Sequence, residues 1–90
     1  MILGTVEVAD FDQFVQTFST KGAEKRKEHG SKGSQVFRDP DDDSRVWIAF
    51  EWEMEGYQRF IADPEVPGIF QEAGLQGPPV IVEAAGQFDS

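Results

Sequence analysis

The chain has 90 residues, of which 39% are hydrophobic and 28% charged, a balance typical of a folded globular protein. Seventeen acidic residues against eight basic ones give a formal charge of -9. That sign disfavours nucleic acid and anionic membranes as partners, because both are negatively charged. Cysteine is absent and His29 is the one histidine, which excludes disulfides, thiolate metal sites and multi-histidine metal sites within a single chain. We expect one small domain, residues 1–90, with no metal and no cofactor.

The N-terminal residues 1–7 contain no basic segment followed by a long apolar run, so they do not resemble a signal peptide. No segment approaches the roughly 18 apolar residues that a membrane-spanning helix needs. The expected location is therefore the cytoplasm.

Hydrophobic periodicity predicts a strand and then a helix in the first third of the chain. Residues 2–8 alternate with period two, which is typical of a strand. Asp10, with Gln13 three residues later, resembles a capping box and predicts a helix that begins there and ends at Gly30. The apolar face of this helix is Phe11, Phe14, Val15, Phe18 and Gly22.

The rest of the chain predicts a hairpin, further helices and a last strand. Residues 33–38 and 45–53 form two strands around a polar turn, and the second is rich in aromatic and β-branched residues. Helical spacing follows over residues 57–63, where a proline interrupts it, and a short helical piece over 66–74. A proline pair then opens the last strand, residues 80–85.

The element order β-α-β-β-α-β is that of the ferredoxin-like, split βαβ fold, which belongs to the α+β class. Right-handed crossovers place the four strands of the antiparallel sheet in the order 4-1-3-2, with the helices on one face. The residues that should face the helices and form the core are Ile2, Val6, Val8, Val36, Val46, Ile48, Phe50, Trp52, Val80 and Val82.

The opposite sheet face is predicted to carry four large apolar residues, Leu3, Phe37, Trp47 and Ile81. Exposed apolar patches that contain Trp and Phe usually mark an interface, so we expect a homodimer formed through this face.

The same face is predicted to carry Glu7, Glu51 and Glu83. Burial in a dimer would raise some of their pKa values and could create an acid/base or metal site. Alternatively, they lie at the open ends of the dimer or pair with Arg45 or Arg38.

Several side chains could serve a small-molecule site. His29 has the one side chain that titrates near neutral pH, which suits proton transfer, but it could equally be a surface residue at a helix end. Trp52 and Tyr57 could stack on a planar ligand, with the hydroxyl of Tyr57 as a polar contact, or could simply be core. A basic cluster could steer an anionic ligand, balance the acidic turn of another copy, or be a solvated helix face; its members are Lys21, Lys25, Arg26, Lys27 and Lys32.

The chain also resembles a known group of proteins. The resemblance lies in residues 29–34 (HGSKGS), 38–40 (RDP), 50–52 (FEW), Phe60 with the Asp-Pro pair after it, and 77–79 (GPP). These segments are similar to the dimeric α/β-barrel superfamily, and most of all to antibiotic biosynthesis monooxygenase-like proteins. The resemblance implies a homodimer whose two sheets form one barrel, with a small pocket between sheet and helices in each subunit. Members include cofactor-free oxygenases of polyketide-like aromatics, haem-degrading enzymes and polyketide cyclases.

The chain departs from this family's pattern in two places. Members commonly use an asparagine in the pocket, and this chain has none. Haem-degrading members need a histidine on the second predicted helix, where this chain has Phe60 and Ile61, so haem degradation is disfavoured. Trp52 matches the tryptophan that members place near the end of the third strand.

The expected function is that of a cofactor-independent oxygenase or cyclase, an oxidoreductase-like protein acting on a small aromatic molecule. Trp52, Phe14, Phe18 and Phe60 would contact the ligand, and His29 and Tyr57 would be catalytic. A ligand-binding or stress-response homodimer without enzymatic activity is the alternative, and a purely structural dimeric module is a third possibility.

Overall fold

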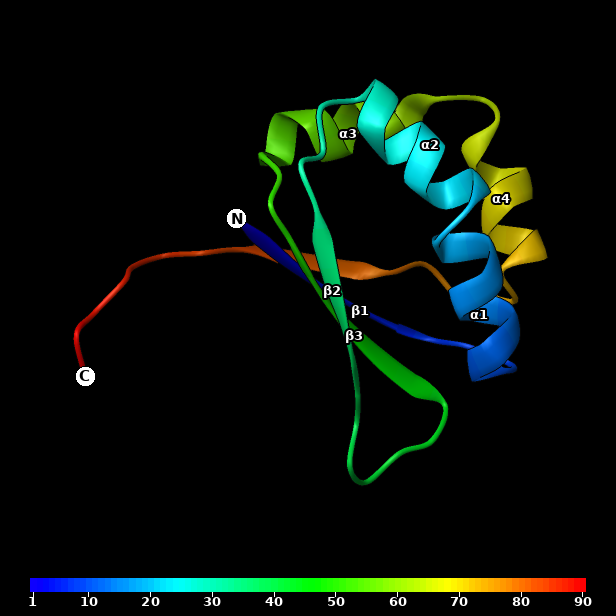
Figure 1. Ribbon diagram of the computed structural model, residues 1–90, viewed down its shortest axis with the longest axis horizontal. Helices are drawn as coiled ribbons and strands as arrows, with labels where there is room; N and C mark the ends of the chain where they lie inside the picture. The colour runs from blue at the N-terminus through cyan, green and yellow to red at the C-terminus, as the bar shows by residue number, and fades with distance from the viewer.

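The computed structural model describes residues 1–90 and has four strands and four helices (Figure 1). In chain order the elements are β1 (Ile2–Glu7), α1 (Phe11–Phe18), α2 (Lys21–Glu28), β2 (Ser34–Arg38), β3 (Arg45–Phe50), α3 (Met54–Ala62), α4 (Val66–Glu72) and β4 (Val80–Glu83).

The strands form one antiparallel sheet in the order β2-β3-β1-β4. This is the predicted order counted from the other edge. The helices gather on one side of the sheet, and the residues after β4 extend away from it (Figure 1). None of the helices has the length and apolar character that a membrane crossing demands.

The first helix begins where the sequence predicts. Asp10 Oδ1 accepts a hydrogen bond from the backbone N–H of Gln13 at 2.8 Å, which satisfies one of the free donors of the first helical turn. The second half of the predicted capping box does not form. The side chain of Gln13 instead donates to the carbonyl of Glu72 at 2.8 Å and ties α1 to the end of α4.

The single helix predicted over residues 10–30 is wrong, because the chain breaks it into α1 and α2 at Ser19 and Thr20. Both hydroxyls donate to the carbonyl of Gln16, at 3.3 and 2.7 Å, so side chains cap the end of α1. The break gives α2 a new direction, in which it packs against α3 and α4. Gly30, with φ of 93°, follows the end of α2 in the left-handed conformation that glycine favours.

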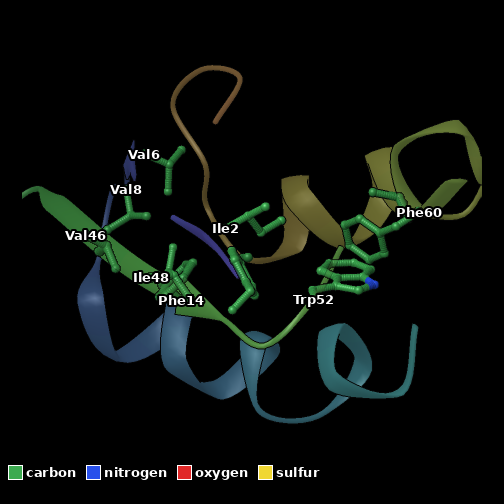
Figure 2. Close-up of a cluster of buried hydrophobic side chains, with 11 residues drawn as sticks. Ile2, Val6, Val8, Phe14, Val46, Ile48, Trp52 and Phe60 are labelled. Carbon is green, nitrogen blue, oxygen red and sulfur yellow. The ribbon is translucent and has the colours of Figure 1, made fainter. Parts of the chain in front are cut away.

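The core lies between the sheet and the helices, as predicted for β1 and β3 (Figure 2). Full burial of a large apolar side chain stabilises a fold by roughly 1.5–3 kcal/mol, so this cluster supplies most of the stability. Its members are Ile2, Val6, Val8, Phe14, Val46, Ile48, Phe50, Trp52, Phe60, Val66 and Ala73.

The predicted orientation of the last strand is wrong. Ile81 lies opposite Gly4 and packs against the core, whereas Val80 and Val82 are 60% and 51% exposed. The cause is steric fit across β1, since a Cβ on Gly4 would lie 2.8 Å from the Cδ1 of Ile81. The isoleucine therefore fills the space that the glycine leaves, and a shift of one residue turns the whole strand over. Glu83, opposite Ile2, consequently leaves the face on which it was expected.

The corrected outer sheet face, defined by Leu3, Phe37, Trp47, Val80 and Val82, is still apolar. Leu3 and Phe37 are 39% and 44% exposed. The indole N–H of Trp47 donates to Asp39 at 2.9 Å. The observed orientation of β4 thus places Val80 and Val82 on this face in the position expected of Ile81, and the face is as apolar as predicted.

Of the three glutamates expected on the outer face, Glu7 is paired with a base. Its carboxylate accepts from Arg45 at 2.7 Å, and the same guanidinium donates to the hydroxyl of Thr5 at 2.9 Å. Glu51 lies beyond the end of β3 and is exposed. The alternative in which these residues form ion pairs therefore holds for Glu7, and the structure groups no carboxylates on this face.

Candidate ligand-binding cavity

A cavity of about 60 Å³ lies between the sheet and the helical layer. Seventeen residues line it, twelve of them hydrophobic, and they come from every element except β2. Gly4 on β1 lines the cavity without a side chain, and the side chains of Ile81 and Phe50 lie over it and form this part of the wall. The cavity is therefore a space that the sheet and all four helices enclose together.

Trp52 forms one aromatic wall of the cavity. Its ring meets those of Tyr57 and Phe60 edge to face, at centroid distances of 5.7 and 5.4 Å. The indole N–H donates to the carbonyl of His29 at 2.9 Å, and the side chain is 4% exposed. Gly56 permits this arrangement, because a Cβ there would overlap the indole nitrogen and lie 2.7 Å from the His29 carbonyl. The Trp52 ring is thus held in one orientation.

A second aromatic wall comes from α1. The rings of Phe14 and Phe18 lie 5.2 Å apart, and Phe18 is 6.3 Å from Phe50 on β3. The structure therefore places five of the six sequence-predicted site residues around one cavity: Trp52, Phe14, Phe18, Phe60 and Tyr57.

Tyr57 is one of the few polar side chains that line the cavity. Burial raises the pKa of its phenol to about 12, because the low-dielectric surroundings disfavour the phenolate. At neutral pH the hydroxyl is therefore un-ionised. It can donate a hydrogen bond to a ligand, but it is not a ready base.

His29, the sixth predicted site residue, does not line the cavity. Its Nε2 lies 3.0 Å from Asp63 Oδ2, and its ring meets the outer side of the aromatic cluster at Phe60, with centroids 6.3 Å apart. The contribution of His29 to the cavity is structural, through the carbonyl that holds the Trp52 indole. The structure thus separates the two residues that the sequence pairs as catalytic.

Asp63 is the centre of a polar cluster beside His29. The backbone N–H of Glu65, the His29 side chain and the Lys25 ammonium together lower the pKa of the Asp63 carboxyl to about 2. Lys25 Nζ lies 3.1 Å from Asp63 and 3.0 Å from Glu28, and it also contacts Glu65. Hydrogen bonds to these carboxylates raise the pKa of the lysine, that from Glu65 most. The cluster fastens α2 to the α3–α4 connection.

Ligand atoms of Glu28, His29 and Asp63 all lie within 4.8 Å of one another, which is close enough to hold a metal ion. The Lys25 ammonium already contacts both carboxylates. A second cation would be repelled by it, so the arrangement favours a salt-bridge cluster over a metal site.

Arg26 is the one charged residue that lines the cavity, and it was not among the predicted site residues. It is 7% exposed and lines the cavity, although it was grouped with the surface bases. Its Nη2 donates to the Phe18 carbonyl at 2.9 Å, and its guanidinium carbon lies 3.7 Å from the centroid of the Phe18 ring. Arg26 follows Gly22 by one helical turn and so shares its helix face, but this spacing does not distinguish a buried arginine from an exposed one.

Comparison with known structures shows several with this fold. SnoaB, a cofactor-independent oxygenase from Streptomyces nogalater, is 15% identical and superposes with a TM-score of 0.72, covering 99% of this chain and 95% of its own. A proposed antibiotic biosynthesis monooxygenase from Deinococcus radiodurans is 16% identical, with a TM-score of 0.63 and coverage of 100% and 98%. A conserved protein from Methanosarcina mazei Go1 is also 16% identical, with a TM-score of 0.64 and coverage of 90% and 85%.

Sequence comparison adds nothing to this, since no family model and no curated protein matches the chain. The structural matches confirm at the level of the fold that the chain resembles antibiotic biosynthesis monooxygenase-like proteins. At identities this low they define a fold and not an activity.

Proposed function

We propose that the chain binds a small planar aromatic molecule between sheet and helices and oxygenates or cyclises it without a resident cofactor. The observation that carries the proposal is the cavity walled by Trp52, Phe60, Phe14 and Phe18. Aromatic rings packed edge to face present flat surfaces on which another ring can stack. The fold shared with a cofactor-independent oxygenase supports the choice of chemistry.

The size of the cavity limits how the ligand enters. Its volume is about 60 Å³, whereas a dry cavity that binds benzene has a volume of about 150 Å³. A ring therefore binds only if the helical layer moves outward from the sheet. Backbone hydrogen bonds tie the chain just after α4 to the end of β1, from the N–H of Gln76 to the carbonyl of Glu7 and from the N–H of Ala9 to the carbonyl of Gly74, both at 2.9 Å. The movement must therefore open the layer at α3 and at the start of α4, where no such bonds hold the helices to the sheet.

Oxygenation without a cofactor requires the substrate to supply all the electrons. Conversion of a ring methylene flanked by aromatic rings to a ketone satisfies this balance. One atom of O2 becomes the ketone oxygen, the other leaves as water with the two methylene hydrogens, and the four electrons come from the carbon. In this reaction the protein excludes water, orients the ring and donates a hydrogen bond to the substrate oxygen from the neutral Tyr57 hydroxyl.

Binding without turnover is the second candidate function. It is favoured by the composition of the cavity wall, which contains no carboxylate and no imidazole. A proton must leave the ring carbon during oxygenation, and no side chain in the wall is a ready base at neutral pH. A substrate acidic enough to lose this proton to water is compatible with the first function, and a less acidic one leaves the chain a binding protein.

The two functions are separated by measuring binding and oxygen uptake on the same ligand. We expect a hydroxylated anthrone to bind in calorimetry and to drive oxygen uptake at an electrode, with one water and one ketone formed per O2. Ile69→Trp fills the cavity from α4 and should abolish binding, whereas Ile61→Trp, on the exposed side of α3, should not. Binding without oxygen uptake would establish the second function, and the absence of any ring binding would contradict both.

We also propose that two copies associate through the outer sheet face. The support is the exposure of Leu3, Val80 and Val82 on the adjacent strands β1 and β4, and of Phe37 on β2, on a face that no other part of the chain covers. Val82→Glu places a charge on this face beside Leu3 and should convert a dimer to a monomer in sedimentation velocity. Ile61→Glu makes the same change on the helical side and should leave the dimer intact. A wild-type chain that sediments as a monomer at high concentration would refute the association.

A further inference from the structure

We propose that a second site, on the surface and outside the cavity, binds a phosphate group. The site is a hollow of about 130 Å³ between α2 and the loop that leads from α2 into β2. Three bases and two serines are among the residues that line it: Arg26, Lys27, Lys32, Ser31 and Ser34. The proposal does not depend on ring binding, since the hollow and the cavity are separate spaces and share only Arg26 in their walls.

The bases around this hollow have no acidic partner. Of the five bases that cluster in the sequence, Lys21 and Lys25 form ion pairs with carboxylates. Arg26, Lys27 and Lys32 form none, and these three are the ones that line the hollow. Burial lowers the pKa of Arg26 to about 10, so it is still charged at neutral pH. The structure thus sorts the basic cluster into a paired part and an unpaired part that surrounds one space.

The wall of the hollow contains no acidic residue, although the chain has seventeen acids and eight bases. The net charge of -9 opposes an anion at long range, but salt screens charges beyond a Debye length of about 8 Å under physiological conditions. Within that distance three positive charges act on an anion in the hollow. The hollow is therefore a local site of positive potential on an acidic protein.

Hydrogen bonds hold the loop beside α2 before any ligand binds. Gly30, in the left-handed conformation, turns the chain after the helix. The backbone N–H of Ser31 donates to the carbonyl of Arg26 at 3.0 Å, and that of Lys32 donates to the carbonyl of Glu51 after β3, also at 3.0 Å. The loop is thus joined to α2 at one end and to the sheet at the other. A site that is formed in advance loses less entropy when it binds a ligand.

The free donors of the wall suit the oxygens of a phosphate. The hydroxyls of Ser31 and Ser34 form no hydrogen bond within the chain, unlike the two hydroxyls that cap the end of α1. Because no buried side-chain atom lacks a partner, the Ser31 hydroxyl is open to solvent, and Ser34 and both lysines are exposed. A phosphate monoester offers three strong acceptor oxygens and nearly two negative charges at neutral pH. Three bases and two hydroxyls match it better than they match a carboxylate, which has two oxygens and one charge.

The carboxylate of Glu51 lies beside the loop and opposes an anion there. Its Oε2 would be 3.9 Å from a Cβ at Gly33. The residue is exposed, does not line the hollow, and has no carboxylate oxygen within 4 Å of the Lys32 ammonium. The lysine is therefore free to meet a ligand. Glu51→Gln removes the repulsion and should strengthen phosphate binding by up to about twofold.

The test is an NMR titration of the full ¹⁵N-labelled chain with inorganic phosphate at pH 7.5, with sodium chloride at equal ionic strength as the reference. The amide signals of residues 31–34 should shift and saturate in the millimolar range. Lys32→Gln and Ser31→Ala should each weaken binding by about three- to tenfold, because each removes a hydrogen bond to a charged group. Arg59→Gln is the matched control, since it removes the same charge from an exposed base on α3 that forms no ion pair, and it should bind as the wild type does.

Phenyl phosphate, titrated in the same way, identifies the source of the phosphate group. Tighter binding of the ester than of inorganic phosphate supports a phosphorylated organic ligand, and equal or weaker binding supports free phosphate. The site itself would be overturned by shifts that sodium chloride reproduces, or by an unchanged affinity when Lys27→Gln and Lys32→Gln are combined. Both lysines are exposed, so this variant should keep the cooperative urea transition of the wild type. Ring binding in the cavity is measured separately, and neither result decides the other.

Discussion

Replacement of Gly56 by alanine tests whether the Trp52 ring is held as rigidly as the structure indicates. The added Cβ would overlap the indole nitrogen and lie 2.7 Å from the carbonyl of His29. Because the indole and the carbonyl are themselves joined by a hydrogen bond of 2.9 Å, the methyl group cannot be accommodated unless α3 moves or that bond breaks.

The expected change in the free energy of unfolding is the sum of three contributions, of which one stabilises the fold and two destabilise it. Alanine in place of glycine favours a helix by up to about 1 kcal/mol. Leaving the buried indole N–H without an acceptor costs about 1–3 kcal/mol, and forcing an extra methyl group into a filled site costs about 1–3 kcal/mol. The net expectation is a loss of about 1–5 kcal/mol in the free energy of unfolding, which for a chain of this size lowers Tm by at least about 4 °C.

Urea unfolding followed by tryptophan fluorescence, at a fixed protein concentration, measures this change. Gly68→Ala is the matched control, because a Cβ at Gly68 on α4 would meet nothing within 4 Å. It should stabilise the protein by about 0.5–1 kcal/mol through helix propensity and a less flexible unfolded chain. If Gly56→Ala proved as stable as Gly68→Ala, the close approach of α3 to Trp52 would be refuted.

Two titrations test the electrostatics around the cavity. Tyr57 is the one tyrosine, so tyrosinate absorbance of the folded chain reports this residue alone; its midpoint should lie near 12, and a midpoint near the ordinary 10.0 would show that the phenol is not buried. The Asp63 pKa is lowered from 3.8 to about 2, so its ionised form contributes stability above pH 3.8 that is lost as the pH falls toward 2. The wild-type chain should therefore exceed Asp63→Asn in urea midpoint at pH 5, and the two should converge near pH 2; a constant difference across this range would exclude the assignment.

The sequence alone determined the elements whose patterns are local. The alternation in β1, the aromatic and β-branched run in β3 and the cap at Asp10 each depend on neighbouring residues, and each forms, although β3 ends at Phe50 and not at Glu53 as predicted. The order of the strands in the sheet follows from the element order and from the handedness of the crossovers. The apolar site residues could also be found, because their spacing on predicted elements directs them to the helical side of the sheet.

The tertiary structure decided which way β4 faces and which base enters the cavity. Val80, Ile81 and Val82 are all apolar, so the strand has no alternation to fix its phase, and the space above Gly4 selects the isoleucine. Arg26 has the composition of a surface residue, and its burial depends on the break that redirects α2 over the aromatic ring of Phe18. In both cases the deciding contact joins residues from different elements, and a pattern along one segment carries no information about the partner that will pack against it.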